Sequence, residues 1–85
     1  MANVEAKVKE ILLEILDVQE EDITPTASFI DDLKATSIDL VEIVTALQNT
    51  FDVNINEAEV ARLRTVQDAV DFLKAAIAQK GAGAS

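Results

Sequence analysis

Apolar residues in the first part of the chain recur every three or four positions, and charged residues separate them. The apolar set is Val4, Val8, Ile11, Leu12 and Ile15. This spacing places side chains on one face of a helix, with the charged residues on the other. The pattern predicts an amphipathic helix over residues 3–16, with Asn3 as its N-cap.

The next segment, residues 17–35, shows no sustained period and contains the only proline of the chain, Pro25. We interpret it as a long ordered loop. Ile23, Phe29 and Leu33 are spaced through the segment, and we expect them to anchor the loop to the core. Loops of this length are uncommon inside compact domains and are often functional.

A second helix is predicted to begin at Thr36, because Asp39 follows three residues later in a pattern resembling a capping box. Its apolar positions continue to about Phe51 and form an arc wider than one core contact requires. Two interpretations remain open at this point. The surplus apolar residues contact a ligand or partner, or the helix is simply central in its bundle.

Two further capping signals follow. Asn56 with Glu59 predicts a short helix that ends near Arg62, and Thr65 with Asp68 predicts the start of a last amphipathic helix. The apolar residues of that last helix are Val66, Ala69, Val70, Leu73, Ala76 and Ile77. The small, glycine-containing stretch 79–85 is predicted to be a flexible tail.

Together these elements predict an all-α fold. We expect a small four-helix bundle, with three longer helices, one short helix and a long ordered loop between the first and second helices. A chain of 85 residues has room for one domain, which we assign to residues 1–78, followed by the tail 79–85. Hydrophobic residues make up 49% of the chain, which is enough for a core and disfavours disorder.

The charge balance narrows the range of partners. Sixteen acidic residues stand against seven basic ones, for a net charge of −9. Such a chain repels nucleic-acid phosphates and anionic membranes, and it favours a protein partner with a basic patch. The other interpretation is that the acidic residues only keep a small protein soluble. No apolar run approaches the ~20 residues that span a bilayer, and no signal-peptide pattern is present, so we expect a cytoplasmic protein.

The residue types needed for most enzymatic chemistry are missing. Cysteine and histidine are absent, which excludes a thiol nucleophile and the usual general base. The three serines, Ser28, Ser37 and Ser85, therefore have no histidine to activate them. We expect a protein that is not itself an enzyme.

A metal site is not expected either. The segment from Asp52 to Asn56 imitates the start of a calcium-binding EF-hand loop. However, Glu57 stands where that loop requires glycine, and Leu63 stands where it requires a bidentate glutamate. The segment therefore fails as an EF-hand.

The most informative segment is residues 31–42, Asp-Asp-Leu-Lys-Ala-Thr-Ser-Ile-Asp-Leu-Val-Glu. It places Ser37 in the first turn of the predicted second helix, directly after the long loop. A hydroxyl there faces outward, and a helix N-terminus accommodates a phosphate group. Taken alone the signal is weak, because serine is common at helix starts for capping reasons.

This segment resembles the phosphopantetheine attachment motif of acyl carrier proteins, Asp-Leu-Gly-x-Asp-Ser-Leu-Asp-x-Val-Glu. The resemblance extends to residues 29–33, 46–52 and 65–72, and it covers roughly residues 3–78 in order. Several patterns at the family's spacing are far more specific than one short motif.

The resemblance implies that Ser37 receives 4′-phosphopantetheine from coenzyme A through a phosphodiester bond. The terminal thiol of that arm would hold acyl groups as thioesters. The arm would therefore supply the reactive sulfur that a chain without cysteine lacks. The implied partners are a phosphopantetheinyl transferase and the acyl-transferring and chain-elongating enzymes, and the carrier itself is expected to be monomeric. The residues expected to meet these partners are Asp32, Ile38, Asp39, Val41 and Glu42.

The segment also departs from the family's motif. Lys34 replaces its glycine, Thr36 the aspartate before the serine, and Ile38 the leucine after it. Thr45, Gln48 and Asn49 replace a common methionine and two often acidic positions. These changes leave a specialised acyl, polyketide or lipid pathway open beside fatty acid synthesis, with a restricted choice of transferase. An unmodified acidic helical interaction module and a carrier of aminoacyl or peptidyl groups are the alternatives.

Overall fold

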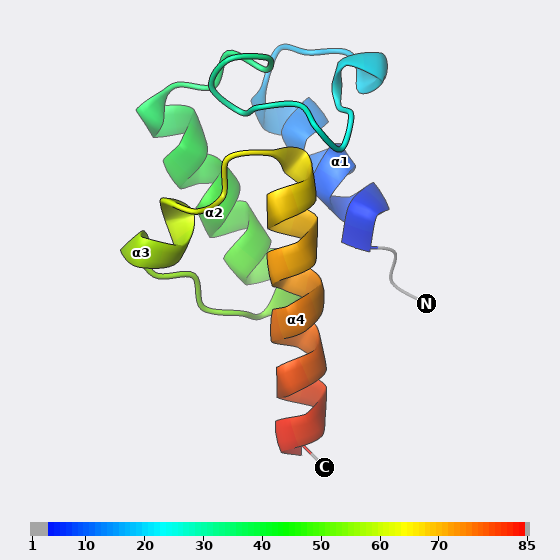
Figure 1. The fold of residues 1–85 in the computed structure, drawn as a ribbon, viewed down its shortest axis with the longest axis vertical. Helices are drawn as coiled ribbons and strands as arrows, with labels where there is room; N and C mark the ends of the chain where they lie inside the picture. Colours follow the sequence, from blue (N-terminus) through cyan, green and yellow to red (C-terminus); the bar gives the residue numbers. More distant parts are fainter. Residues whose placement is uncertain (1–3, 85) are drawn as a thin grey trace.

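The computed structural model describes residues 4–84, with side chains described through Gln79. Its elements, in chain order, are α1 (Val4–Ile15), the 3₁₀ turn η1 (Glu20–Asp22), α2 (Ser37–Phe51), α3 (Glu57–Val60) and α4 (Val66–Ala84). Figure 1 shows α1, α2 and α4 grouped as a bundle, with the short α3 beside α2. The prediction of an all-α bundle with three longer helices and one short one is confirmed.

The core lies where α1 packs against α2 and α4. The helices α1, α2 and α4 each contribute buried residues at helical spacing, and the long loop contributes apolar residues of its own. The three predicted anchors of the loop, Ile23, Phe29 and Leu33, are all buried. The most deeply buried large side chains are Leu12, Leu33, Leu47, Leu73 and Val8. Burial of each such side chain contributes about 1.5–3 kcal/mol, so the loop is held by the same force as the helices.

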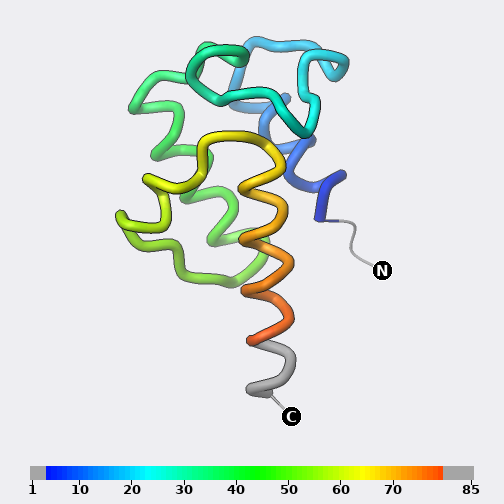
Figure 2. Tube along the Cα trace, viewed as in Figure 1, coloured from blue at the N-terminus to red at the C-terminus, as the bar shows by residue number. Residues whose placement is uncertain are grey.

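The long loop closes one end of the bundle, as the trace in Figure 2 shows. It is also hydrogen-bonded to the connector between α3 and α4. The amide of Phe29 donates to the carbonyl of Arg64 at 3.0 Å, and the amide of Val66 donates to the carbonyl of Ala27 at 3.1 Å. Ser28 and Thr65 form an isolated antiparallel bridge within this contact. The connector thereby fixes the loop that leads to α2.

The three capping pairs predicted from the sequence are present, whereas Asn3, the predicted N-cap of the first helix, lies outside the described residues. Thr36 with Asp39 and Asn56 with Glu59 form reciprocal capping boxes at the starts of α2 and α3. At the start of α4, the Thr65 hydroxyl accepts the Asp68 amide and the Asp68 carboxylate accepts the Thr65 amide, both at 3.2 Å. These bonds satisfy amide groups that a helix start otherwise leaves unpaired.

Two features differ from the sequence-based expectation. The predicted loop contains the 3₁₀ turn η1, and the amide of Gln19, directly before this turn, donates to the Asp22 carboxylate at 3.0 Å. At the other end of the chain, α4 continues through Ala84, past the position where a tail was expected to begin. Ser85 lies outside the described residues, and the flexibility of the segment 79–85 stays a prediction.

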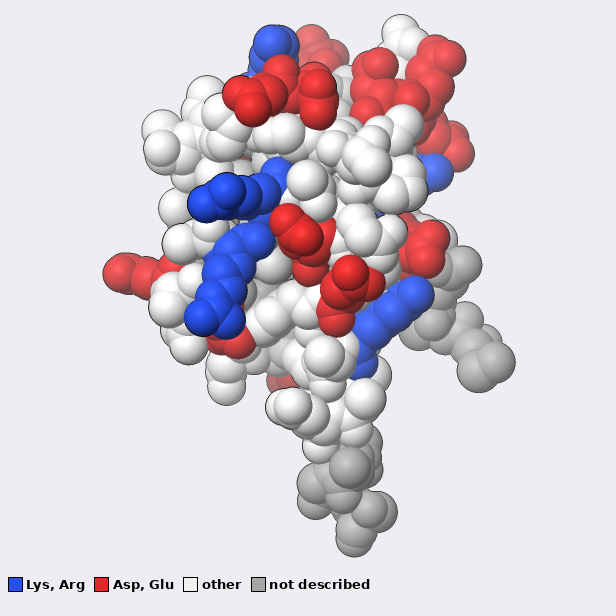
Figure 3. Space-filling view, in the orientation of Figure 1, with Lys and Arg blue, Asp and Glu red and all other residues white. Residues whose placement is uncertain are grey.

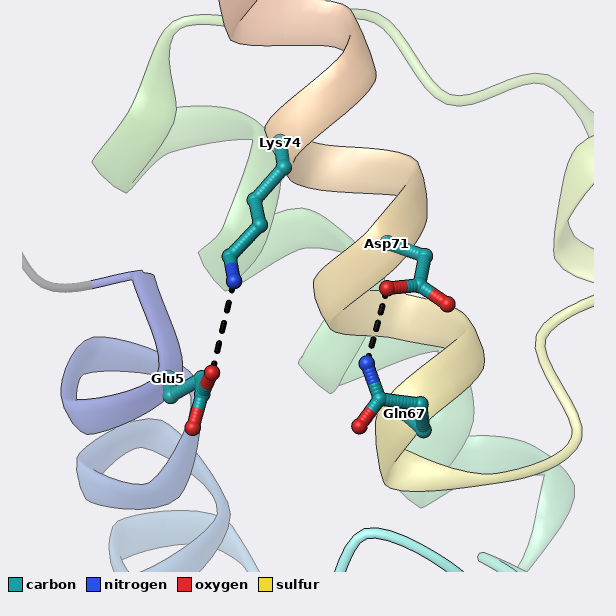
Figure 4. Close-up of polar contacts among 4 residues, drawn as sticks. All are labelled: Glu5, Gln67, Asp71 and Lys74. Atoms are coloured by element: carbon teal, nitrogen blue, oxygen red, sulfur yellow. Dashed lines mark hydrogen bonds and ion pairs between the residues drawn. The ribbon is translucent and has the colours of Figure 1, made fainter.

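Exposed ion pairs link α1 to its neighbours. Lys74 of α4 reaches Glu5 of α1 at 3.3 Å, and Figure 4 shows this contact beside the hydrogen bond from Gln67 to Asp71 within α4. Exposed pairs of this kind are worth about 0–1 kcal/mol each, so the apolar core carries the stability. Among residues 4–84, no helix is long and apolar enough to cross a bilayer.

Candidate functional site

Ser37 is the first residue of α2, at the end of the molecule that the long loop closes (Figure 1). Its side chain is exposed to solvent. Within the part of the chain that the structure describes, the Ser37 hydroxyl forms no hydrogen bond, so nothing in the fold engages it. The sequence prediction of an outward-facing hydroxyl at this helix start is confirmed.

Thr36 sets the start of α2. Its backbone is extended, with φ −90° and ψ 173°, and its hydroxyl accepts the amide of Asp39 at 3.2 Å. The Asp39 carboxylate in turn accepts the amide of Thr36 at 3.0 Å. Because Thr36 is the N-cap, Ser37 falls on the first helical residue rather than on the cap itself. The capping explanation for a serine at this point therefore does not apply to Ser37.

The surplus apolar residues of α2 point outward. Ile38 is 72% exposed and Val41 is 65% exposed, whereas Ile43 and Leu47 face the core. Residues three apart are neighbours on a helix surface, so Ile38 and Val41 form an apolar patch next to Ser37. The wide apolar arc was given two interpretations. Because two of its residues face solvent, the helix is not simply central in its bundle.

The three carboxylates predicted to meet partners are placed differently. Asp32 accepts the amide of Ser28 at 2.6 Å and so braces the loop. Asp39 is part of the capping box. Glu42 is exposed and forms no hydrogen bond or ion pair within residues 4–84. Glu42 is therefore the one carboxylate of the three that no internal contact engages.

Lys34 has a backbone feature that the sequence pattern did not reveal. Its φ is 59°, in the left-handed region that favours glycine. The side chain is exposed, between the buried Leu33 and Ala35. The only signal that could have indicated this geometry was the glycine at the corresponding position of the motif that the segment resembles.

Three surface hollows lie away from these residues, and two of them are larger than the third. Of these two, one, of about 480 Å³, lies among α1, η1 and the start of α4, and the other, of about 580 Å³, lies between the α2–α3 connector and α4. None of the three is lined by Ser37 or by the five predicted partner-contacting residues. Among the described residues, no group of three acidic side chains is placed to hold a metal ion.

Comparison with known proteins agrees with this geometry. A family model described as the phosphopantetheine attachment site matches residues 6–73. The acyl carrier proteins of the Tuc7 and 5A strains of Buchnera aphidicola subsp. Acyrthosiphon pisum are each 45% identical over 74 residues. These matches cover 87% of this chain and 92% of each relative.

The fold has a solved counterpart as well. The structure of the acyl carrier protein from Enterococcus faecalis matches with a TM-score of 0.75 at 30% sequence identity. The match covers 86% of this chain and 92% of that one. The chain therefore belongs to the acyl carrier protein family, whose members carry acyl groups on 4′-phosphopantetheine.

Proposed function

We propose that Ser37 is the residue that carries the 4′-phosphopantetheine arm. The observation that carries the proposal is an exposed hydroxyl, free of internal hydrogen bonds, on the first residue of α2. A transferase can reach such a group without opening the fold. The exposed apolar pair Ile38 and Val41 gives an enzyme a surface to bind beside it.

The other two serines fit this role less well. Ser28 is partly buried in the loop, and its hydroxyl accepts the amide of Asp31 at 3.2 Å. Modification of Ser28 would break that turn. Ser85 lies outside the described residues and outside the span that the family model matches.

The modification is a phosphoryl transfer that the partner enzyme catalyses. The Ser37 oxygen forms a bond to the pantetheine phosphorus while the pyrophosphate bond of coenzyme A breaks. The hydroxyl proton is lost and adenosine 3′,5′-bisphosphate leaves. The arm, once attached, supplies the thiol that this cysteine-free chain lacks. The chain then acts as a carrier for separate enzymes and catalyses no step itself.

The docking surface for those enzymes is proposed to be the outward face of α2. Ile38 and Val41 supply apolar contact, and Glu42 supplies a carboxylate for basic residues on the partner. Asp39 and Asp32 add negative charge near the same end while they hold the cap and the loop. Monomeric behaviour and a cytoplasmic location stay predictions from the sequence.

The neutral residues of α2 bear on the choice of pathway. Gln48 has a structural role, because its side-chain oxygen accepts the amide of Ile55 at 2.9 Å and holds the α2–α3 connector. Thr45 and Asn49, in contrast, are exposed and uncharged. The docking face is therefore less acidic than the motif resemblance implies. We propose service in a dedicated acyl, polyketide or lipid pathway as the alternative to primary fatty acid synthesis.

The test is an intact-mass measurement after incubation with coenzyme A and a broad-specificity phosphopantetheinyl transferase. We expect a gain of one phosphopantetheine unit in the wild-type protein and in Ser28→Ala, and no gain in Ser37→Ala. A gain that persists in Ser37→Ala contradicts the assignment. No gain in any variant, while a known carrier is modified in parallel, means either that a dedicated transferase that tolerates Thr36 and Lys34 is required or that the chain is a helical module that is never modified.

A further inference from the structure

Lys34 occupies a backbone conformation that suits a different residue. A side chain with a Cβ at φ 59° is held there at a conformational cost that glycine avoids. The flanking residues fix this geometry, since Leu33 is 2% exposed and Ala35 is 5% exposed. The amide of Ala35 also donates to the carbonyl of Phe29 at 2.7 Å. A costly conformation that the surrounding fold imposes next to a modification site suggests a function for the side chain.

The charge of Lys34 is not neutralised within the fold. Its ammonium forms no ion pair in the part of the chain that the structure describes, although the protein has a net charge of −9. Of the acidic residues close to it in sequence, Asp31 is exposed and forms no ion pair with it, and two others are engaged elsewhere. Asp32 accepts the Ser28 amide, and Asp39 accepts the Thr36 amide. An exposed cation thus stands at the loop end of α2.

The position of this cation is close to the proposed attachment site. Lys34 precedes Ser37 by three residues, so their Cα atoms are separated by at most about 11 Å of extended chain. The four-carbon stem of lysine extends its reach further. A phosphodiester on the Ser37 oxygen places one negative charge within this range. The residue directly before Ser37 is Thr36, so no carboxylate at that position competes for the ammonium.

We propose that Lys34 is a positioning residue for the arm, and that its ammonium pairs with the phosphodiester attached to Ser37. The proposal rests on the proposed function of Ser37. The pair restrains the base of the arm at the loop end of α2 and offsets the charge that modification adds to an already acidic molecule. Charge-assisted hydrogen bonds from an ammonium to phosphate oxygens are the contacts that this geometry supports.

The first experiment compares the reactivity of lysines in the apo and holo proteins, each verified by intact mass. Both are treated briefly with an acetylating reagent, and the extent of labelling is read for each lysine by peptide mass spectrometry. A neighbouring phosphate favours the charged, unreactive form of an amine. We expect Lys34 to react about twofold or more slowly in the holo protein. The internal controls Lys7, Lys9 and Lys74, on α1 and α4, should not change.

The second experiment measures the difference in melting temperature between holo and apo forms. We expect this difference to be greater, by roughly 1–4 °C at low salt, in the wild type and in Lys34→Arg than in Lys34→Gln. Lys7→Gln removes one exposed charge elsewhere and should behave as the wild type does. The comparison is made within each variant, so a change in its basal stability cancels.

The outcomes separate the two proposals. Equal labelling of Lys34 in the apo and holo proteins, or an unchanged holo–apo difference in Lys34→Gln, overturns the contact and leaves the attachment site standing. If Ser37 does not gain the arm with any transferase tested, or if the arm is attached to another residue, both proposals fail. If Lys34→Gln lowers only the turnover by partner enzymes, Lys34 acts on the partner and the intramolecular contact is wrong.

Discussion

Position 34 places opposite demands on its residue, because the backbone favours glycine and the proposed contact needs a cation. Of the non-glycine residues that the structure describes, only Lys34 and Asp52 have a positive φ. Asp52 ends α2 in the left-handed conformation that commonly terminates helices. Lys34 lies in the loop that leads to Ser37, where no helix end requires this conformation. The free-energy cost of this conformation at Lys34 can be measured by substitution.

We expect Lys34→Gly to be more stable than Lys34→Ala by about 1 kcal/mol in the apo protein. Both substitutions remove the charge, and only glycine relieves the left-handed strain. Chemical denaturation of the two variants gives the difference in free energy of unfolding. An alanine variant as stable as the glycine variant would show that position 34 is not strained.

Thr36 gives a second prediction at this scale. Thr36→Ala removes the hydroxyl that accepts the Asp39 amide, so we expect a loss of about 1 kcal/mol in the free energy of unfolding. Thr36→Asp retains an acceptor and should stay within about 0.5 kcal/mol of the wild type. Equal losses in the two variants would argue against capping as the role of this side chain.

Some residues could be assigned from sequence and others could not. Thr36, Asn56 and Thr65 were predicted as caps because their partners lie three residues away. The bond from Ser28 to Asp32 and the strain at Lys34 depend on the path of the loop, which no local pattern specifies. The exposure of Ser37 followed from the helix start, whereas its selection over other serines required the motif.

At the scale of elements, α2 combines a structural face with a docking face. Ile43 and Leu47 lie in the core, while Ile38 and Val41 are exposed beside Ser37. The helix is held at its start by the loop and at its end by the bond from Ile55 to Gln48. A helix fixed at both ends presents its exposed face in one orientation, which suits recognition by several enzymes.

Glu42 is the residue with which to test the docking face. Glu42→Gln should leave the free energy of unfolding within about 0.5 kcal/mol of the wild type, because no contact within the described residues is lost. The rate of modification at limiting protein concentration should fall, since a rim charge acts mainly on association. Glu14→Gln removes an exposed carboxylate from α1 and serves as the matched control. A fall of equal size in both variants would reflect net charge and not a specific docking face.

The elements themselves were largely predictable. Apolar spacing predicted α1, α2 and α4, and capping pairs predicted the starts of α2, α3 and α4 within one residue. The turn η1 was missed because three residues are too few to show a period. The bridge between Ser28 and Thr65 was missed because it joins distant segments. The sequence predicted a flexible tail over residues 79–85, whereas α4 is helical through Ala84, and the flexibility of this segment stays a prediction.

At the scale of the whole molecule, charge is distributed unevenly. Figure 3 shows acidic side chains around the end that the loop closes and basic side chains over the connector from α3 to α4, where Arg62 and Arg64 lie. The three ion pairs found among the described residues are all exposed. They offset little of the net charge of −9, so repulsion among the remaining carboxylates opposes the compact state.

This repulsion predicts how stability responds to ions. The molecule measures 39 × 27 × 20 Å, and the screening length at 0.1 M salt is about 10 Å. Added salt therefore weakens repulsion between carboxylates on different elements, and we expect the melting temperature of the apo protein to rise with ionic strength. Divalent cations should raise it further, because they concentrate around dense negative charge.

A comparison of magnesium with calcium distinguishes diffuse screening from binding at a discrete site. No group of three acidic residues among those described is placed to bind a metal ion, so the effect should be diffuse screening. Magnesium and calcium at matched ionic strength should then give equal shifts in melting temperature without saturation at low concentration. A calcium-specific shift that saturates would instead require a discrete site. The segment that imitates an EF-hand, Asp52 to Asn56, would be the first to test by Asp52→Asn and Asn54→Ala.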